Sequence, residues 1–458
     1  MKTNVLMTSK EKRFIKNCIY LVGILVLGAV IQTKGHAQEK SILTKERQLI
    51  VINDIREKLE KIYPFPEIGM KTSKNILQNF EDNKYLAYKA PDDFAQRLSR
   101  DLEDISHDGH LEVFYDPEMA AQMKEQEKEW KEPSLAALKA EEYRWTNFGF
   151  KELKILDGNI GYLDLRTFFP IKYAGKTAVA SMNYFSECNA LIIDLRKNGG
   201  GWDDMVMFLS SYFFDIDSPE ITSIAHSTLD GTYYSSMLSS YVPGEKLTEI
   251  PLYILISSFT ASAAEGFANI MNHLNDKTTL VGEKTGGAEN PAERVVICNE
   301  FILRIPCWKR IYSATGSGWE GIGVEPDIHV DAESALFTAH LEALKKLSQN
   351  DLNEKNKKKY QWAIDGVIAR NNPINIKDSV LQSYAGKYGR KTIYYENGDL
   401  YYQLSDIISK SKMLPITDNY FLINNHDDFR IVFKKEKGSI VGLEEIFDDG
   451  YIIKNAKE

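Results

Sequence analysis

The hydroxyl side chains of Ser257, Ser258, Thr260 and Ser262 lie between an apolar run and an amphipathic stretch at 262–274. Ser and Thr cap helices well, because their side-chain oxygens accept backbone N–H groups. A Ser at a helix N-terminus is also a candidate nucleophile, since the helix dipole favours negative charge there. The cluster therefore indicates either a helix cap or a nucleophile.

Three consecutive glycines, Gly199, Gly200 and Gly201, follow another apolar run at 190–196. Glycine permits a tight turn, and it also lets the backbone approach a ligand closely with its N–H groups exposed. A Ser nucleophile beside exposed N–H groups is the arrangement of acyl transfer, in which those groups stabilise an oxyanion. Together the two segments favour acyl-transfer chemistry.

A parallel sheet is the element that would bring these two segments together. Apolar runs alternate with helical patterns along the chain, the runs at 190–196, 252–256 and 279–282 and the helices at 174–187, 203–214 and 262–274. Strands that are apolar along their whole length and alternate with helices are typical of a parallel sheet covered on both faces. Ligands of such sheets bind beyond the carboxyl ends of the strands, where both segments lie.

The spacing of apolar residues differs before and after this α/β region, and these differences divide the chain into domains. Helical spacing of apolar residues precedes it, and Asn397-Gly398 between alternating apolar runs predicts a β-hairpin after it. We therefore expect a helical domain (38–116), a linker or helix (117–147), an α/β core (148–349), a charged linker (350–374) and a small all-β domain (375–458). Within the core, a hairpin is expected at 295–306.

Five segments together resemble the tail-specific, or C-terminal processing, serine peptidases. They are "DGHLEVFY" (108–115), "LIIDLRKNGGG" (191–201), "TASAAEGFA" (260–268), "LVGEKTGG" (280–287) and "GSGWEGIGVEPDIHV" (316–330). The resemblance covers roughly residues 45–348. It is greatest to the branch shared with interphotoreceptor retinoid-binding protein, because no PDZ insert separates the first two segments. It implies a ClpP/crotonase-like α/β fold.

The resemblance selects one hydroxyl and its neighbours. The family motif S-A-S-A-S-E places the nucleophile at Ser262, and Ala263 would donate one oxyanion N–H. The second donor would be Gly200, with Gly201 as the near alternative.

The base that the resemblance implies is a histidine. Processing peptidases carry a Lys where this chain has Ala288, so the usual Ser–Lys dyad is absent. The related tricorn-type peptidases use Ser, His and Glu, and the matching residues here are His110 and Glu320. A neutral His can take the Ser proton, and a carboxylate can fix its tautomer. Lys284 is the alternative base.

Two other kinds of site are disfavoured. His107 and His110 have an H-x-x-H spacing, but no further acid or Cys stands at ligand spacing, so no metal is expected. "GSGWEG" (316–321) fits G-x-G-x-x-G formally, but Pro326 follows where a dinucleotide site needs a helix. We expect no cofactor.

The N-terminal segment 1–37 is interpreted as a secretory signal. Basic residues precede an apolar run at 18–31, and small residues precede a cut before Gln38. An uncleaved membrane anchor is the alternative. The whole chain has a net charge of −9, and loss of the basic segment would make it more acidic, which argues against nucleic acid as a partner.

These observations predict an exported serine endopeptidase, periplasmic or extracellular, and the family resemblance implies that its substrates are unfolded or partly unfolded polypeptides. Two alternatives remain open. One is a non-catalytic peptide- or lipid-binding protein on the same fold, and the other is hydrolysis of a non-peptide ester or amide by the same residues.

Overall fold

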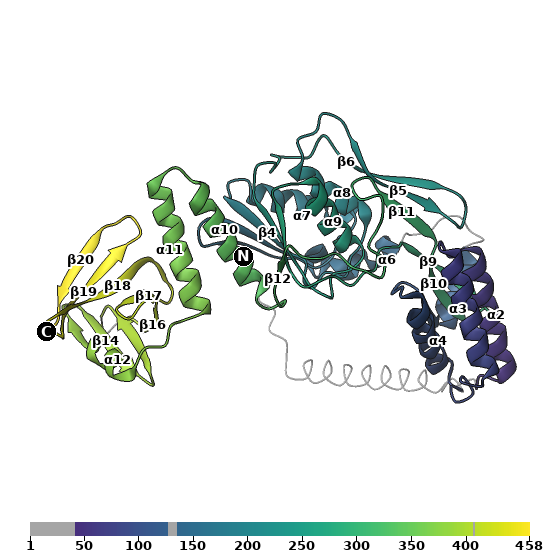
Figure 1. Ribbon diagram of the computed structural model, residues 1–458, viewed down its shortest axis with the longest axis horizontal. Helices are drawn as coiled ribbons and strands as arrows, with labels where there is room; N and C mark the ends of the chain where they lie inside the picture. The colour runs from purple at the N-terminus through teal and green to yellow at the C-terminus, as the bar shows by residue number, and fades with distance from the viewer. Residues whose placement is uncertain (1–41, 127–134, 406–407) are drawn as a thin grey trace, which may run out of the picture.

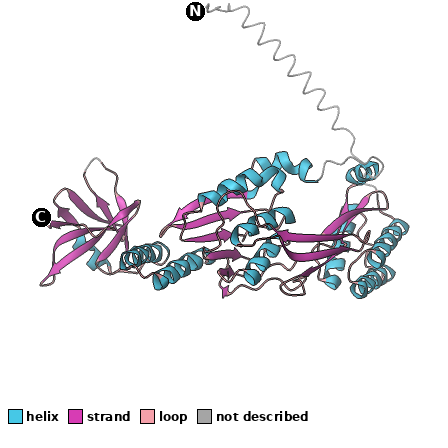
Figure 2. Ribbon diagram, turned by 90° about the horizontal axis from the view of Figure 1, so that it is seen from above, coloured by secondary structure: helices cyan, strands magenta, loops and turns pink. Residues whose placement is uncertain are grey.

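The computed structural model describes residues 42–126, 135–405 and 408–458. Its three parts lie in a row, with the N-terminal helices at one end, the α/β core in the middle and the C-terminal β domain at the other end (Figures 1 and 2). The predicted signal at 1–37 lies outside the described residues. Among the described helices, none is both long and apolar enough to cross a membrane.

The N-terminal part is helical, as predicted. It contains α2 (Lys45–Lys61), α3 (Pro66–Glu81) and α4 (Pro91–Ser106), followed by the short strand β1 (Glu112–Tyr115). The helical spacing of Ile52, Ile55 and Leu59 buries one face of α2 completely. Helix α3, which the sequence analysis did not predict, begins with a Pro at its first turn, where the missing N–H costs no hydrogen bond.

One hairpin of the predicted core packs with these helices instead. Strands β9 (Ala292–Ile297) and β10 (Phe301–Pro306) form an antiparallel sheet with β1, in the order β1-β10-β9. The side chains of Phe301, Leu303 and Ile305 belong to the same apolar core as α2 and α4. The assignment of all of 148–349 to one core was therefore wrong for this hairpin, since alternation predicts strands but not the sheet that they join.

The central sheet has six strands in the order β12-β8-β7-β4-β3-β2. They are β2 (Phe150–Leu156), β3 (Ile160–Leu165), β4 (Ala190–Asp194), β7 (Leu252–Ile256), β8 (Thr278–Gly282) and β12 (Ile328–His329). Strands β3, β4, β7, β8 and β12 are parallel, and β2 is antiparallel to β3. The predicted parallel sheet is confirmed.

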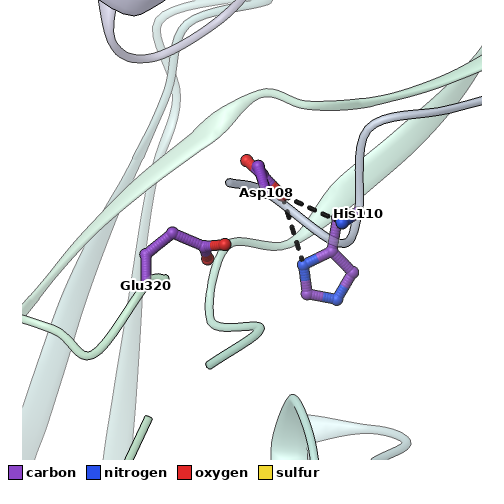
Figure 3. Close-up of side chains that lie close together, drawn as sticks. All are labelled: Asp108, His110 and Glu320. Carbon is purple, nitrogen blue, oxygen red and sulfur yellow. Dashed lines mark hydrogen bonds and ion pairs between the residues drawn. The ribbon is translucent and has the colours of Figure 1, made fainter. Parts of the chain in front are cut away.

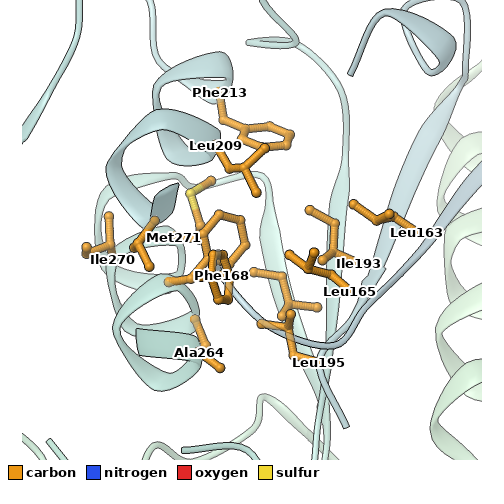
Figure 4. Close-up of a cluster of buried hydrophobic side chains, with 14 of the residues drawn as sticks. Leu163, Leu165, Phe168, Ile193, Leu195, Leu209, Phe213, Ala264, Ile270 and Met271 are labelled. Atoms are coloured by element: carbon orange, nitrogen blue, oxygen red, sulfur yellow. The ribbon is translucent and has the colours of Figure 1, made fainter. Parts of the chain in front are cut away.

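Helices cover both faces of this sheet, which explains why its strands are apolar throughout. Helices α7 (Ile171–Tyr184), α8 (Asp203–Ser210) and α9 (Ala263–Leu274) cover one face, where Ile193 belongs to the larger core (Figure 4). Helices α10 (Ala335–Asn350) and α11 (Glu354–Asn371) cover the other, where Ile192 lies.

Helix α11 occupies the segment that was predicted to be a charged linker. Its apolar residues Tyr360, Ala363, Ile364 and Val367 recur at helical spacing and pack in the core with α10. The charged residues that precede Tyr360 in "NEKNKKKY" form the largely exposed first part of this helix. The expectation of a linker at 350–374 was therefore wrong for 354–371.

The C-terminal domain is a β-meander with one short helix, α12 (Asp378–Tyr384). Its eight strands follow each other in chain order: β13 (Gly386–Tyr388), β14 (Lys391–Glu396), β15 (Asp399–Gln403), β16 (Ser411–Pro415), β17 (Tyr420–Ile423), β18 (His426–Glu436), β19 (Ser439–Phe447) and β20 (Ile452–Ala456). Asn397 and Gly398 both have positive φ, 54° and 88°, as a type I′ hairpin turn requires.

The remaining elements lie between the N-terminal part and the core or extend from the core. They are α5 (Pro117–Gln126), α6 (Leu135–Arg144), two short turns at Asn147–Gly149 and Ser211–Phe213, and a three-stranded antiparallel sheet of β11 (Trp308–Tyr312), β5 (Glu220–Ser227) and β6 (Tyr233–Leu238).

Candidate active site

Ser262 occupies the turn between the β7 loop and helix α9. It is the N-cap residue of α9, and its backbone has φ 55° and ψ −123°, a region that residues other than Gly rarely adopt. Such strain persists only where the surrounding structure holds it, and it concentrates at functional sites. A nucleophile on a strained turn between strand and helix is a known arrangement of hydrolases.

The glycine loop lies directly against Ser262. A Cβ atom added to Gly200 would lie 2.8 Å from the Ser262 Cβ, and one added to Gly201 would lie 2.2 Å from the Phe168 carbonyl oxygen. Both glycines also have positive φ, 111° and 141°. Only glycine fits at these two positions, which explains two of the three consecutive glycines.

The backbone N–H groups around Ser262 differ in their partners. The Gly200 N–H donates to the Asn198 side-chain oxygen at 2.9 Å. The N–H groups of Gly201 and Ala263 have no hydrogen-bond acceptor among the described residues. The turn therefore leaves two donors beside the Ser262 hydroxyl.

Glu265 holds this turn together, and the sequence analysis did not single it out. It is fully buried, and one carboxylate oxygen accepts the N–H groups of Ser262 (2.8 Å) and Ala288 (2.9 Å). Its other oxygen accepts the Gly287 N–H and the Thr285 hydroxyl. The Ser-x-x-Glu spacing of a capping box was the available signal.

The sequence analysis expected no lysine base at Ala288 and left Lys284 as the alternative base. Lys284 forms an ion pair with Glu325 at 2.8 Å, and it is not among the residues that line the cavity described below.

His110 follows the C-terminal end of α4, where His107 adopts a left-handed conformation. The His110 side chain is buried, and its Nδ1 atom, 4.0 Å from Asp108 Oδ1, has no hydrogen-bond partner among the described residues. Burial, and then the nearby charge of Arg304, lower the pKa of His110 to about 4. The imidazole is therefore neutral at pH 7 and able to accept a proton.

Glu320 and Asp108 form a carboxyl pair beside the His110 ring (Figure 3). One ring nitrogen of His110 and one carboxylate oxygen each of Asp108 and Glu320 lie within 4.8 Å of one another. Burial, and then the Asp108 carboxylate, raise the pKa of Glu320 to about 8, and burial raises the pKa of Asp108. Two adjacent buried carboxyls of this kind share one proton near neutral pH.

Hydrogen bonds fix both members of this pair. Glu320 Oε2 accepts the backbone N–H groups of Glu289 and Asn290 and the Asn290 side-chain N–H at 2.7 to 2.9 Å. Its Oε1 is buried and has no hydrogen-bond partner in the part of the chain that the structure describes. Asp108 accepts the Tyr63 hydroxyl and the His110 backbone N–H, both at 2.9 Å. The sequence analysis missed the role of Asp108, although it belongs to the "DGH" segment.

This trio is also the one group among the described residues whose His and carboxylate atoms could hold a metal ion. Three of the four carboxylate oxygens already accept hydrogen bonds. The arrangement therefore favours an acid–base role over metal binding.

Ser262 and His110 line one cavity of about 1430 Å³. The glycine loop and Ala263 also line it, whereas Asp108 and Glu320 do not. No hydrogen bond joins the Ser262 hydroxyl to His110 among the described residues, and the two belong to different parts, the α/β core and the N-terminal helices. Catalytic hydrogen bonds often tighten only when substrate is bound.

Comparisons with known proteins match two successive parts of the chain to one peptidase family. Residues 159–330 match the profile of peptidase family S41, and residues 37–145 match the N-terminal domain of Peptidase_S41 in eukaryotic IRBP. The chain is 26% identical over 182 residues to a carboxy-terminal-processing protease of Bartonella bacilliformis, a match covering 38% of this chain and 40% of that protein. It is 32% identical over 131 residues to a carboxyl-terminal-processing protease of Synechocystis sp., covering 28% of each.

Among solved structures, a photosystem II D1 C-terminal processing protease is similar at 14% identity and a TM-score of 0.39, with 62% of this chain and 93% of that chain covered. The chain spans less than half the length of the two curated relatives. The two profile matches come from one family and follow each other along the chain. The protein belongs to peptidase family S41.

Proposed function

We propose that this protein is a serine endopeptidase that hydrolyses polypeptides with Ser262 as nucleophile and His110 as general base. One observation carries the proposal: a strained Ser at a helix N-terminus shares a cavity with a neutral histidine and lies beside two N–H groups that have no acceptor among the described residues. The segment 1–37 supports the further proposal that the protein is exported.

The proposed reaction begins with the Ser262 hydroxyl. His110 takes its proton as the oxygen attacks the carbonyl carbon of the substrate. Nδ1 of His110 faces Asp108 (Figure 3), so Nε2 is the nitrogen that acts in the cavity. The imidazolium then returns the proton to the leaving amine, and water hydrolyses the acyl-enzyme by the reverse transfer.

The negative charge of the tetrahedral intermediate falls on the substrate oxygen. Ala263 N–H is one proposed donor to it, and its place at the start of α9 adds the helix dipole. Gly201 is favoured as the second donor, because the Gly200 N–H already donates to Asn198. Gly200 then provides the space that the oxyanion occupies.

Glu320 is proposed to orient the imidazole together with Asp108. The carboxyl pair carries one negative charge when it shares a proton, which is sufficient to stabilise an imidazolium. The unpartnered atoms His110 Nδ1 and Glu320 Oε1 would pair when the site closes on substrate.

A binding protein without catalysis is the alternative. It needs no neutral histidine beside the serine, and the strained Ser262 backbone would have no purpose in it. Catalysis is therefore the better supported function.

The test is degradation of an unfolded substrate such as β-casein by wild type, Ser262→Ala and Ser258→Ala. Ser258 lies in the same loop, and its weak hydrogen bonds at 3.4 Å go to Glu283. We expect Ser258→Ala to keep activity and Ser262→Ala to lose it. Equal activity of all three proteins would contradict the proposal.

A further inference from the structure

A second cavity, named here the α11 cavity, lies at the opposite edge of the central sheet from Ser262. Its volume is about 440 Å³, and part of its wall is formed by Asn159 and Asn189, which directly precede β3 and β4. Ser262 and the glycine loop instead follow the carboxyl ends of β7 and β4. Among the described residues, none lines both cavities. A ligand of the α11 cavity would therefore not contact the catalytic serine.

Three parts of the chain form the walls of the α11 cavity. They are the start of β3 and β4 in the core, helix α11, and the β17–β20 region of the C-terminal domain (Figure 1). Arg370 of α11 joins the other two parts, since it forms ion pairs with Asp157 of the core and, at 2.7 Å, with Asp427 of the C-terminal domain. The Trp362 indole N–H also donates to the Asp427 carbonyl at 3.3 Å. The cavity is therefore held by the contacts that dock the two domains.

The charges that line the α11 cavity are incompletely paired. Arg370 pairs with two aspartates, and Arg430 pairs with Asp365, which lies outside the lining, at 3.4 Å. The side chains of Lys359 and Asp448 form no ion pair or hydrogen bond with any described residue, and both are exposed. The cavity therefore presents one free positive group and one free negative group. The charged residues of the lining that the structure describes are Asp157, Asp427, Asp448, Lys359, Arg370 and Arg430.

Polar groups with unused hydrogen-bonding capacity add to these two charges. The side-chain amides of Asn159 and Asn189 donate to backbone carbonyls at 2.6 and 3.1 Å, and their oxygens accept from no described residue. Arg430 is only 1% exposed, and its guanidinium lies 3.8 Å from the Trp362 ring. Its Nε–H has no acceptor in the part of the chain that the structure describes, so the charge of this buried arginine is only partly compensated.

We propose that the α11 cavity binds an amino acid or a short peptide through its free ammonium group and its free carboxylate. An ammonium group donates three hydrogen bonds, and the Asp448 carboxylate and the two asparagine oxygens are acceptors for it. The carboxylate is matched by the unpaired Lys359 and by the positive charge of the buried Arg430. A zwitterion satisfies both free groups, whereas an anion or a cation alone would leave one of them unpaired. The volume is also that of a small-molecule site.

This inference goes beyond the proposed function, because it concerns binding at a cavity remote from Ser262. The test is calorimetric titration of the full chain carrying Ser262→Ala with the dipeptide Ala-Ala and with its N-acetylated, C-amidated and doubly blocked forms. We expect each single block to weaken binding about 10- to 100-fold, the effect of losing one charge-assisted contact. Alanine and tetra-alanine, titrated in the same way, distinguish an amino-acid site from a peptide site. Equal binding of the free and the doubly blocked dipeptide, or no binding, overturns the proposal.

Variants assign the two preferences to the two free groups. Lys359→Gln should remove most of the preference for a free carboxylate, and Asp448→Asn should remove most of the preference for a free ammonium group. Lys358→Gln and Asp449→Asn are the matched controls, because both residues are exposed neighbours that do not line the cavity. An equal loss in the controls overturns the site.

A further variant distinguishes this site from the catalytic cavity. Lys151→Gln removes a positive charge from the lining of the catalytic cavity, and it should leave the titrations unchanged. A preference that is lost in Lys151→Gln and kept in Lys359→Gln would place the dipeptide in the catalytic cavity and overturn the proposal. Because every titration uses Ser262→Ala protein, the result does not depend on peptidase activity.

Discussion

The side chains of Glu289 and Glu320 each accept a hydrogen bond from the backbone N–H of the other residue. The Glu289 N–H donates to Glu320 Oε2 at 2.7 Å, and the Glu320 N–H donates to Glu289 Oε2 at 3.1 Å. Glu289 also accepts the Trp319 N–H, and its carboxylate occupies the space that a side chain at Gly318 would need. This reciprocal pair fixes the loop that presents Glu320 to His110.

Removing the Glu289 carboxylate should loosen this loop. Glu289→Ala leaves the buried Trp319 N–H unpaired, at a cost of about 1–3 kcal/mol, and also the partly buried Glu320 N–H. We expect a lower melting temperature and a reduced kcat, with Ser262 still in place. Glu325→Ala, at an exposed carboxylate that pairs with Lys284, is the control and should change neither quantity much.

Glycine at position 200 should be indispensable. Gly200→Ala places a methyl group against Ser262 in a backbone conformation that disfavours side chains. We expect at least a 100-fold loss in kcat/KM, a typical cost of disturbing an oxyanion site. At Gly199 a Cβ would meet nothing nearer than Phe259 at 3.7 Å, so Gly199→Ala should lose far less. Comparable losses in the two variants would argue against a special place for Gly200.

The stability of the fold should fall as pH rises through neutrality. Burial and Asp108 raise the pKa of Glu320 from 4.5 to about 8, so the folded protein keeps a proton that the unfolded chain releases in this range. Because the folded state binds more protons there, the free energy of unfolding decreases with pH. Glu320→Gln cannot ionise, so its melting temperature relative to wild type should increase from pH 5 to pH 8.5. If the melting temperatures of the two proteins changed in parallel with pH, the pKa of Glu320 would not be raised in the folded protein.

The pH at which kcat/KM falls on the acid side of its profile should depend on Arg304. The pKa of His110 is lowered by burial and then by Arg304, so the loss of that positive charge should raise it. In Arg304→Gln the acid limb of kcat/KM should therefore move to higher pH, measured with an amidated substrate that lacks acids. An unchanged limb would mean that His110 does not titrate in the active enzyme, or that the arginine charge does not reach it.

Truncation should show that α11 belongs to the core. A chain ending at Gln349 would expose the α10 surface that Tyr360 and Ile364 cover, and it would also remove the ion pair of Arg370 with Asp157. A chain ending at Asn372 keeps the α10 surface covered and keeps the ion pair of Arg370 with Asp157. We expect 38–372 to be soluble and to retain activity on short peptides, and 38–349 to melt at lower temperature or aggregate. Similar stability of the two chains would contradict this packing.

The sequence predicted the local parts of this molecule well. The apolar strands and the helix after Ser262 follow from short patterns, because burial on both sides of a parallel sheet leaves a continuous apolar run. The strain at Ser262 and the contacts of Glu265 and Asp108 were not predictable in the same way. Their partners come from distant segments, such as Tyr63 for Asp108, and local periodicity does not encode such contacts. The β9–β10 hairpin was predicted as a hairpin but was assigned to the α/β core instead of the N-terminal part, for the same reason.

The proposed unit of Ser262 and His110 should lose activity in a non-additive way. Ser262→Ala and His110→Ala should each reduce kcat at least about 1000-fold, and the double variant should be little worse, because such residues act together. Lys284→Ala should be close to wild type, since Lys284 is ion-paired outside the cavity. Loss of activity in Lys284→Ala with activity kept in His110→Ala would make the lysine the base.

Covalent labelling with a fluorophosphonate, followed by mass spectrometry of the digested protein, tests the central claim most directly. Only a serine whose proton is taken by a nearby base reacts readily with this reagent. We predict a single label on Ser262 in wild-type protein, and at least a 100-fold slower reaction in His110→Ala. No label on Ser262 in folded wild-type protein, or labelling that is equally fast without His110, would contradict the account.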